Sequence, residues 1–268
     1  MIGTAATPVL NGRPLSVLNA SGTPAQDERA RGSTIEFIDV DFSLSVAREV
    51  IEAIRTRDPA APFAYVVTPN VDHVVRLQRS RSDLWPVYRG AWMTLCDSQV
   101  LARMASWTSR LSIPVLPGSD LTARMFEEVI EPHDRVTIIG GQRHDVDALA
   151  QRYGLHDICH FDPPRGFIHN ATDIAQAVQF VTQARGRYVL LAVGSPQQEI
   201  LAHRIARAGG AIGIGLCGGA RPEFLSGVQK RAPEVMRRFA VEWLYRLGTD
   251  PRRLSRRYLV DGPEIFRI

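Results

Sequence analysis

Six polar residues follow predicted strands of this sequence, where a sheet could bring them to one edge. They are Thr68 and Asn70 in VVTPNVDH, Asp97 in TLCDSQV, Asp120 in LPGSDLT, and Gln198 with Glu199 in VGSPQQE. Each one alone fits a cap or turn residue, and the prolines that follow two of the strands, Pro69 and Pro196, fit turns as well. Together they supply a hydroxyl, amides and carboxylates, a set that suits a polyhydroxylated substrate.

Asp97 separates a short predicted strand, 93–96, from a predicted helix. The apolar residues of that helix recur every three to four positions: Val100, Leu101, Met104 and Trp107. As an N-cap, the Asp97 carboxylate would accept backbone N–H groups and contribute about 1 kcal/mol. As a catalytic group, it would lie outside the carboxyl end of a strand, where open α/β sheets place their ligands. This stretch alone favours the cap and leaves the catalytic role open.

Glycines end three predicted strands: Gly140 with Gly141, Gly194, and Gly218 with Gly219. Such glycines let the backbone approach a ligand, and the following helix offers N–H groups to an anion. Tight turns between strand and helix often need glycine anyway, so a nucleotide or phosphate site and plain turn chemistry both stay open. No G-x-G-x-x-G or G-x-x-x-x-G-K-[ST] pattern is completed, which disfavours NAD binding and Walker-type ATP hydrolysis.

The triplet DVD at 39–41 has the D-x-D pattern that can hold a divalent metal. It lies in or just after the first predicted strand, so the sequence favours a strand edge and turn instead. The seven histidines show no H-x-x-x-H or similar spacing, and no G-x-S-x-G elbow is present. We therefore expect no catalytic metal and no other cofactor, and a hydrolase is disfavoured.

Short apolar strands alternate with amphipathic helices from Thr34 onward, beginning with TIEFIDV, AREVIEAIRT, FAYVVT and VDHVVRLQRS. Helices are also predicted near 145–152, 172–185 and 197–207. This alternation predicts an α/β, Rossmann-like, mostly parallel sheet with helices on both faces. We expect three parts: a disordered leader over 1–33 that is rich in small residues, an α/β core over 34–229, and a basic helical appendage over 230–268.

Composition fits a folded protein of the cytoplasm. The chain has 268 residues, of which 45% are hydrophobic, and it shows neither an apolar run of membrane-spanning length nor a signal peptide. Its three cysteines, Cys96, Cys159 and Cys217, are widely spaced, which favours buried thiols over disulfides or a zinc site.

Positive charge is concentrated at the C-terminal end. Residues 230–268 hold ten Lys or Arg against five Asp or Glu, whereas residues 1–229 hold 22 against 23. Such a tail can bind nucleic acid, anionic lipid or a phosphate-bearing substrate. It contains no recognised nucleic-acid motif, so nucleic acid is the disfavoured partner.

The order of several short motifs resembles the WecG/TagA/CpsF glycosyltransferases, also called glycosyltransferase family 26. These motifs are TPN, the strand ending in Asp97, GSDL, IIGG, VGSPQQE, GLCGGA and the tail KRAPEVMRRFAVEWLYRLGTDPRRLSRRYL. The likeness spans Thr34 to the C-terminus, and the tail is its most specific part. It implies an inverting enzyme that moves a sugar from a UDP-sugar to a polyprenyl-diphosphate-linked saccharide, peripheral on the inner face of the cell membrane and in contact with an anionic membrane surface.

The resemblance also implies residue roles. Asp97 matches the general base of the family. The resemblance overturns the preference for a cap at Asp97, because an inverting transfer needs one base for the acceptor hydroxyl. Substrate-binding residues are implied at Thr68, Asn70, Gln198 and Glu199. UDP-binding residues are implied at Gly140, Gly141, Gly218, Gly219 and Glu223. Diphosphate-binding arginines are implied at Arg246, Arg253 and Arg256, which would meet the leaving-group charge without a metal.

Two departures from the family pattern lie near the implied base. The chain reads Asp97-Ser98-Gln99-Val100 where the family commonly has D-G-x-G, and Val115 stands where an arginine is frequent. They favour an exopolysaccharide-type member and leave the donor open between UDP-glucose and UDP-N-acetylmannosamine types. A non-catalytic nucleotide-sugar-binding assembly protein is the alternative function, and a homo-oligomer is left open.

Overall fold

The computed structural model describes residues 9–10, 13–14, 32–218 and 265. Most of the expected leader and of the expected appendage lies outside these residues. Within the leader, strands β1 (Val9–Leu10) and β2 (Arg13–Pro14) pair in antiparallel fashion. Among the described residues, no helix has both the length and the hydropathy needed to cross a membrane.

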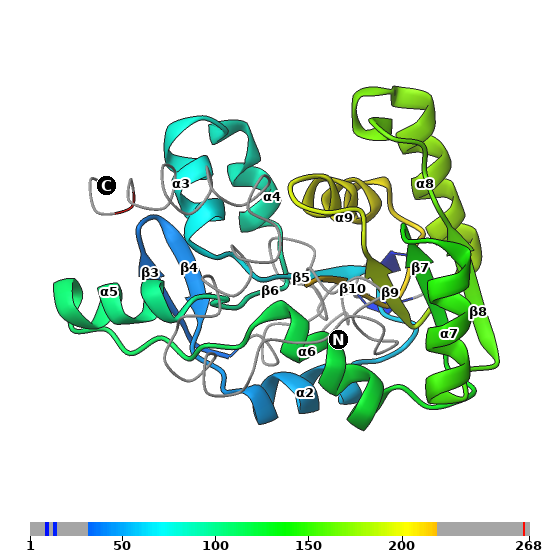
Figure 1. Ribbon diagram of the computed structural model, residues 1–268, viewed down its shortest axis with the longest axis horizontal. Helices are drawn as coiled ribbons and strands as arrows, with labels where there is room; N and C mark the ends of the chain where they lie inside the picture. The colour runs from blue at the N-terminus through cyan, green and yellow to red at the C-terminus, as the bar shows by residue number, and fades with distance from the viewer. Residues whose placement is uncertain (1–8, 11–12, 15–31, 219–264, 266–268) are drawn as a thin grey trace, which may run out of the picture.

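A parallel sheet with the strand order β6-β5-β10-β9-β7-β8 forms the centre of the molecule (Figure 1). The strands are β5 (Ala64–Val67), β6 (Met93–Thr94), β7 (Arg135–Ile139), β8 (Asp157–Phe161), β9 (Tyr188–Leu191) and β10 (Ile214–Cys217). Every pairing among them is parallel. Their continuous apolar runs are typical of a sheet that is covered on both faces, so the predicted α/β class is confirmed.

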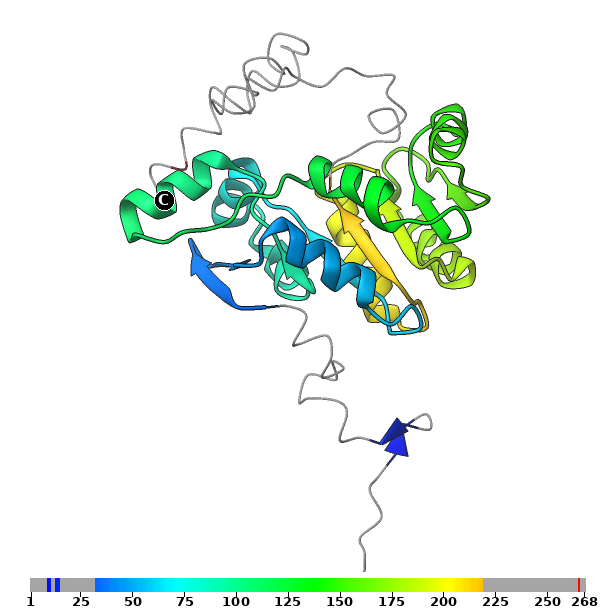
Figure 2. The ribbon, with the colours of Figure 1, turned by 90° about the horizontal axis from the view of Figure 1, so that it is seen from below.

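Helices cover both faces of the sheet, as Figures 1 and 2 show. They are α2 (Ala47–Thr56), α3 (Val71–Arg79), α4 (Trp85–Arg89), α5 (Gln99–Ser109), α6 (Gly118–Arg124), α7 (Arg143–Tyr153), α8 (Ala171–Ala184) and α9 (Gln197–Ala208). A π-helical turn, η3 (Met125–Val129), continues α6, and two 3₁₀ turns are η2 (Ser82–Leu84) and η4 (Phe167–His169).

Alternating side chains of the strands divide the core into two clusters. Strand β5 sends Tyr65 and Val67 into the cluster beneath α3, α4, α8 and α9, and Val66 into the cluster formed with α2, α6 and α7. The period of two along a strand produces this division, because successive side chains point to opposite faces. Helices α2, α8 and α9, which were predicted from apolar periodicity, therefore bury apolar residues in one cluster or the other.

The first predicted strand, TIEFIDV, does not join the parallel sheet, so that expectation was wrong. It forms a separate antiparallel hairpin of β3 (Thr34–Phe37) and β4 (Val40–Ser43). The two turn residues, Ile38 and Asp39, have left-handed φ values of 51° and 58°. A two-residue connection of this type joins antiparallel strands, whereas parallel neighbours need a long crossover. The prediction that the DVD triplet is strand edge and turn is confirmed.

Helix α5 buries only part of its predicted apolar face. Leu101 and Met104 are buried, but Val100 is 36% exposed and Trp107 is 78% exposed. The helix lies at one end of the molecule, beyond the hairpin (Figure 1). It therefore packs through a narrow stripe, and Val100 and Trp107 of its apolar face lie outside the core.

Candidate active site

The carboxyl ends of β5, β6, β9 and β10 bring the predicted polar residues toward one edge of the sheet. The backbone N–H of Asp97, after β6, donates to the carbonyl oxygen of Pro69, after β5, at 3.1 Å. The Thr68 hydroxyl donates to the Cys217 carbonyl oxygen at 3.4 Å, and the Cys217 thiol donates to the Gln198 carbonyl oxygen at 3.6 Å. A chain of contacts thus joins four strand ends that are distant in sequence.

Ser98, not Asp97, caps helix α5. The Ser98 hydroxyl oxygen accepts the backbone N–H of Leu101 at 3.3 Å, in the geometry of an N-cap. The Asp97 side chain is half-buried one residue earlier, outside the helix. The cap interpretation of Asp97 is therefore wrong, because Ser98 holds the N-cap position.

Val115, one of the two departures from the family pattern, lies directly beside the strand that carries Asp97. It forms a parallel β-bridge with Cys96, and the backbone N–H of Leu116 donates to the Cys96 carbonyl oxygen at 2.9 Å. This bridge extends β6 toward the predicted end of the strand at Cys96. The residue at position 115 is thus a neighbour of the Asp97 backbone.

Gly118 allows the start of α6 to approach two other strand ends. A β-carbon at this position would collide with the carbonyl oxygen of Gly218 and with the Thr68 hydroxyl, and both of those residues are buried. Gly118 was singled out from the sequence only as part of the motif GSDL. The signal available was a glycine at the first position of a helix.

Asn70 is the N-cap of α3. Its Oδ1 accepts the backbone N–H groups of Asp72 at 3.1 Å and His73 at 3.4 Å. The interpretation of Asn70 as a cap residue is thus correct for this oxygen. Any contact with a substrate from Asn70 falls to its Nδ2 group, which is a donor.

Gln198 and Glu199 form a buried pair in the first turn of α9. They are 2% and 1% exposed, and Gln198 Nε2 donates to Glu199 Oε1 at 2.9 Å. Gln198 Oε1 and Glu199 Oε2 have no hydrogen-bond partner within the part of the chain that the structure describes. Burial raises the pKa of Glu199 above its ordinary value, against smaller lowering effects from its hydrogen bonds and from Arg76.

Arg76, on α3, and Ser195, in the turn before α9, also act on Glu199, and neither was predicted from the sequence. Arg76 Nη2 donates to the Ser195 hydroxyl at 3.1 Å and lies 3.4 Å from Asp72 Oδ2. The spacing of Asp72 and Arg76, four residues apart on α3, was a readable signal for the ion pair. Burial, and then the Glu199 carboxylate, raise the pKa of Tyr88 well above its ordinary value.

The cysteines carry no thiolate at this edge. Burial raises the pKa of Cys96 to about 12 and that of Cys217 well above its ordinary value. Both side chains are buried, as predicted, whereas Cys159 is partly exposed. A thiol held in its protonated form is a poor nucleophile.

The glycines that end β7 and β9 adopt left-handed backbone conformations. The φ values are 90° at Gly140, 83° at Gly141 and 84° at Gly194. A β-carbon on Gly140 would also press against Ala192 and Val193 at the end of β9. Turn geometry therefore suffices to explain these glycines. Gly219, Glu223, Arg246, Arg253 and Arg256 lie outside the described residues.

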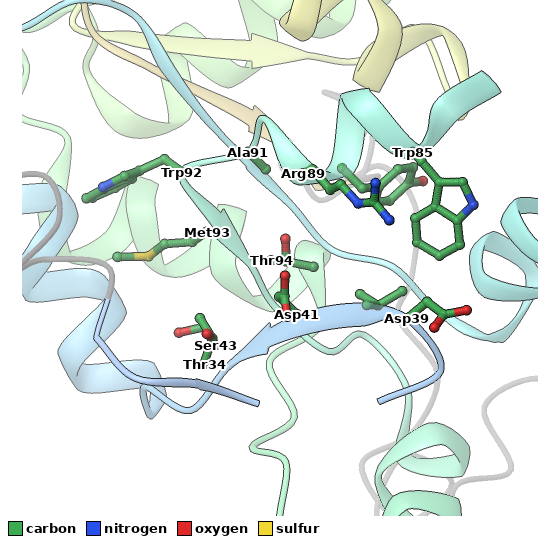
Figure 3. Close-up of a pocket in the computed structure, with 12 residues that line it drawn as sticks. Thr34, Asp39, Asp41, Ser43, Trp85, Arg89, Ala91, Trp92, Met93 and Thr94 are labelled. Atoms are coloured by element: carbon green, nitrogen blue, oxygen red, sulfur yellow. The ribbon is translucent and has the colours of Figure 1, made fainter. Parts of the chain in front are cut away.

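A cavity of about 140 Å³ lies along the edge strand β6, between that strand, the hairpin and α4 (Figure 3). Its lining includes Asp39, Asp41, Thr94, Trp85 and Arg89. Asp39 Oδ2 also accepts from Gln78 Nε2, on α3, at 2.9 Å. The described residues include no cluster of three or more His, Cys, Asp or Glu side chains suited to a metal ion. Carboxylates beside hydroxyl and aromatic groups make this lining suitable for water or sugar hydroxyls.

Residues 35–268 match the model of the glycosyl transferase WecG/TagA/CpsF family. Two similar proteins come from Staphylococcus aureus, strains NCTC 8325 / PS 47 and MRSA252. Each is named N-acetylglucosaminyldiphosphoundecaprenol N-acetyl-beta-D-mannosaminyltransferase. Each is 23% identical over 241 residues, which cover 86% of this chain and 90% of the relative. The resemblance stated from the motifs is confirmed at the level of the family.

Proposed function

Because the chain belongs to the WecG/TagA/CpsF family of glycosyltransferases, we propose that it transfers a sugar from a UDP-sugar to a polyprenyl-diphosphate-linked saccharide in bacterial surface-polymer synthesis. The names of the Staphylococcus aureus relatives support both the lipid-linked acceptor and the transfer of an N-acetylmannosaminyl group. The two departures near Asp97 favour an exopolysaccharide type, for which UDP-glucose is the second donor to test.

Asp97 is the general base of this proposal. The observation that carries it is that Asp97 lies half-buried at the shared sheet edge while Ser98 takes the cap of α5. In the proposed step, an acceptor hydroxyl attacks the anomeric carbon as the bond to the UDP oxygen breaks. The hydroxyl proton goes to the Asp97 carboxylate, and the electron pair leaves with the diphosphate. One direct displacement inverts the configuration of the anomeric carbon.

The other site residues of the proposal position substrates. Thr68, Asn70, Gln198 and Glu199 hold the sugar, and the glycine turns at 140–141 and 218–219, with Glu223, hold UDP. The unsatisfied oxygens of the buried Gln198 and Glu199 support this role, because a buried polar atom without a partner costs about 1–3 kcal/mol.

The basic tail completes the proposed site and places the enzyme on the membrane. Arg246, Arg253 and Arg256 would meet the charge that develops on the diphosphate, so that no metal is needed. The enzyme would be cytoplasmic and peripheral on the inner membrane face. Truncation after Gln229 should lower both transfer and liposome binding while the core stays folded. Unchanged transfer to the lipid acceptor would remove the tail from the mechanism.

The decisive experiment is transfer from UDP-glucose, UDP-N-acetylmannosamine and UDP-N-acetylmannosaminuronic acid to a short-chain polyprenyl-diphosphate sugar, with EDTA present. Product from one donor would support metal-independent transfer and identify the sugar. Product from no donor, with UDP bound and the fold intact, would favour the alternative of a non-catalytic nucleotide-sugar-binding protein.

A further inference from the structure

One face of α5 combines exposed aromatic and cationic side chains. Val100, Arg103, Trp107 and Arg110 are all exposed and follow one another at spacings of three or four residues. Val100, Arg103 and Trp107 therefore lie along one stripe of the helix surface, beside the buried Met104 and away from the buried Leu101 and Ala105. Arg110 follows the last helical residue, Ser109, as the C-cap. We call these four residues the basic aromatic face of α5.

The charge of this face is unbalanced. Helix α5 contains no Asp or Glu, and neither Arg103 nor Arg110 forms an ion pair with another described residue. Trp107 lies between the two arginines in sequence and is 78% exposed. Tryptophan prefers the membrane–water interface, and arginine is attracted to the phosphates of anionic lipids.

We propose that the basic aromatic face of α5 docks the protein onto an anionic lipid bilayer. A protein partner fits this face less well. Val100 and Trp107 are the exposed large apolar residues of α5, whereas a stable interface buries about 800 Å² on each partner. A bilayer can use one tryptophan anchor with flanking cations.

Docking of this face would bring the proposed base, Asp97, close to a lipid-linked acceptor. This part of the inference rests on the proposed function. Helix α5 begins at Gln99, two residues after Asp97, and ends near Arg110. An eleven-residue helix is about 16 Å long. Docking of this face would hold the proposed base within about that distance of the interface, where the diphosphate of a lipid-linked acceptor lies.

Vesicle binding by the full chain tests the proposal. Trp107→Ser and the pair Arg103→Ser with Arg110→Ser are measured by co-sedimentation with phosphatidylglycerol–phosphatidylcholine vesicles. The matched control is Arg48→Ser with Arg55→Ser, two exposed arginines at the same spacing on α2. We expect the double variant of α5 to bind on the order of tenfold more weakly and the control to bind like the wild type.

Depth quenching gives a second measurement that does not depend on a loss of binding. Brominated phospholipids should quench the tryptophan fluorescence of the wild type more than that of Trp107→Phe. Wild-type binding by all α5 variants, equal weakening by the control, or the same quenching in Trp107→Phe as in the wild type would overturn the proposal. Loss of a dimer in Trp107→Ser, measured by sedimentation velocity without vesicles, would overturn it in favour of a second copy.

Transfer assays separate this inference from the proposed function. The α5 variants should keep wild-type transfer to a short-chain acceptor in solution and lose transfer to a long-chain acceptor in vesicles. Equal transfer to both acceptors would contradict docking. If no donor gives product with the wild type or any variant, the proposed function fails. The vesicle measurements would still show whether the basic aromatic face of α5 binds the bilayer.

Discussion

Gln198 donates its Nε2–H to Oε1 of Glu199 at 2.9 Å, and both side chains are buried in the first turn of α9. The bond fixes the orientation of the Gln198 amide and occupies one carboxyl oxygen of Glu199. Within the described part of the chain, the second carboxyl oxygen has no partner. A buried carboxylate in this position is unfavourable, so burial raises the pKa of Glu199 above its ordinary value.

Glu199→Gln should therefore change how stability depends on pH. Burial raises the pKa of Glu199 in the folded state above its ordinary value of 4.5. Between the unfolded and folded pKa values, the folded state binds the proton and the unfolded state does not. Wild-type stability thus falls as pH rises through this window, by up to about 1.4 kcal/mol per pH unit. In urea denaturation across this pH window, the unfolding free energy of the variant should rise relative to that of the wild type as pH rises.

Glu199→Ala separates burial of the acid from its hydrogen bond. This variant leaves Gln198 Nε2 without its acceptor, which costs about 1–3 kcal/mol. It should be less stable than Glu199→Gln at every pH. Parallel stability curves for the wild type and Glu199→Gln would show that Glu199 is charged in the folded protein.

Asp97 and Ser98 should separate catalysis from helix capping. Asp97→Asn removes the proposed base and should lower kcat by at least about a hundredfold, with unchanged affinity for the UDP-sugar. Ser98→Ala removes the cap and should lower the unfolding free energy by about 1 kcal/mol, with kcat near the wild-type value. Steady-state kinetics and urea denaturation of both variants check this. Full turnover in Asp97→Asn would exclude the base assignment.

The parts of the fold that depend on apolar periodicity could be predicted from the sequence. Helix α2 coincides with the predicted segment AREVIEAIRT, and α8 and α9 lie within one residue of their predicted bounds. The hairpin β3–β4 was not predicted because Ile38 and Asp39 enter left-handed conformations without the glycine or asparagine that would signal such a turn. The exposure of Trp107 depends on which elements reach α5, and periodicity does not contain that information.

Only those parts of the site that follow from the order of strands and helices along the chain could be predicted. Parallel strands bring Thr68, Asp97 and Gln198 to one edge, and the alternation of strands and helices predicted that much. The contact between Arg76 and Ser195 joins residues 119 positions apart, so no local pattern contains it. The exclusion of water from Glu199 is likewise a result of packing from several elements.

Arg76 should influence substrate use through Ser195. Arg76→Met removes the hydrogen bond to the Ser195 hydroxyl, in the turn that leads into α9. A bond from a charged donor is worth about 1.5–3 kcal/mol, so kcat/KM should fall by about tenfold or more. A double-mutant cycle with Ser195→Ala checks the contact, since coupled residues differ from additivity by about 0.5–3 kcal/mol. Strict additivity in kcat/KM would show that the bond has no role in transfer.

Gly118→Ala should damage the sheet edge itself. The new methyl group would collide with the Gly218 carbonyl oxygen, which belongs to the backbone and cannot move aside as a flexible side chain could. Overpacking of this kind costs about 1–3 kcal/mol, and UDP-sugar affinity should fall because Thr68 and Gly218 must separate from α6. Gly154→Ala is the control, since Gly154 ends α7 with a φ of 64° and has no atom within 4 Å of a built β-carbon. The unfolding free energy of Gly154→Ala should fall by about 1 kcal/mol through backbone strain alone, and its UDP-sugar affinity should stay unchanged. An equal loss of affinity in both variants would show that general destabilisation, not the contact at Gly118, controls binding.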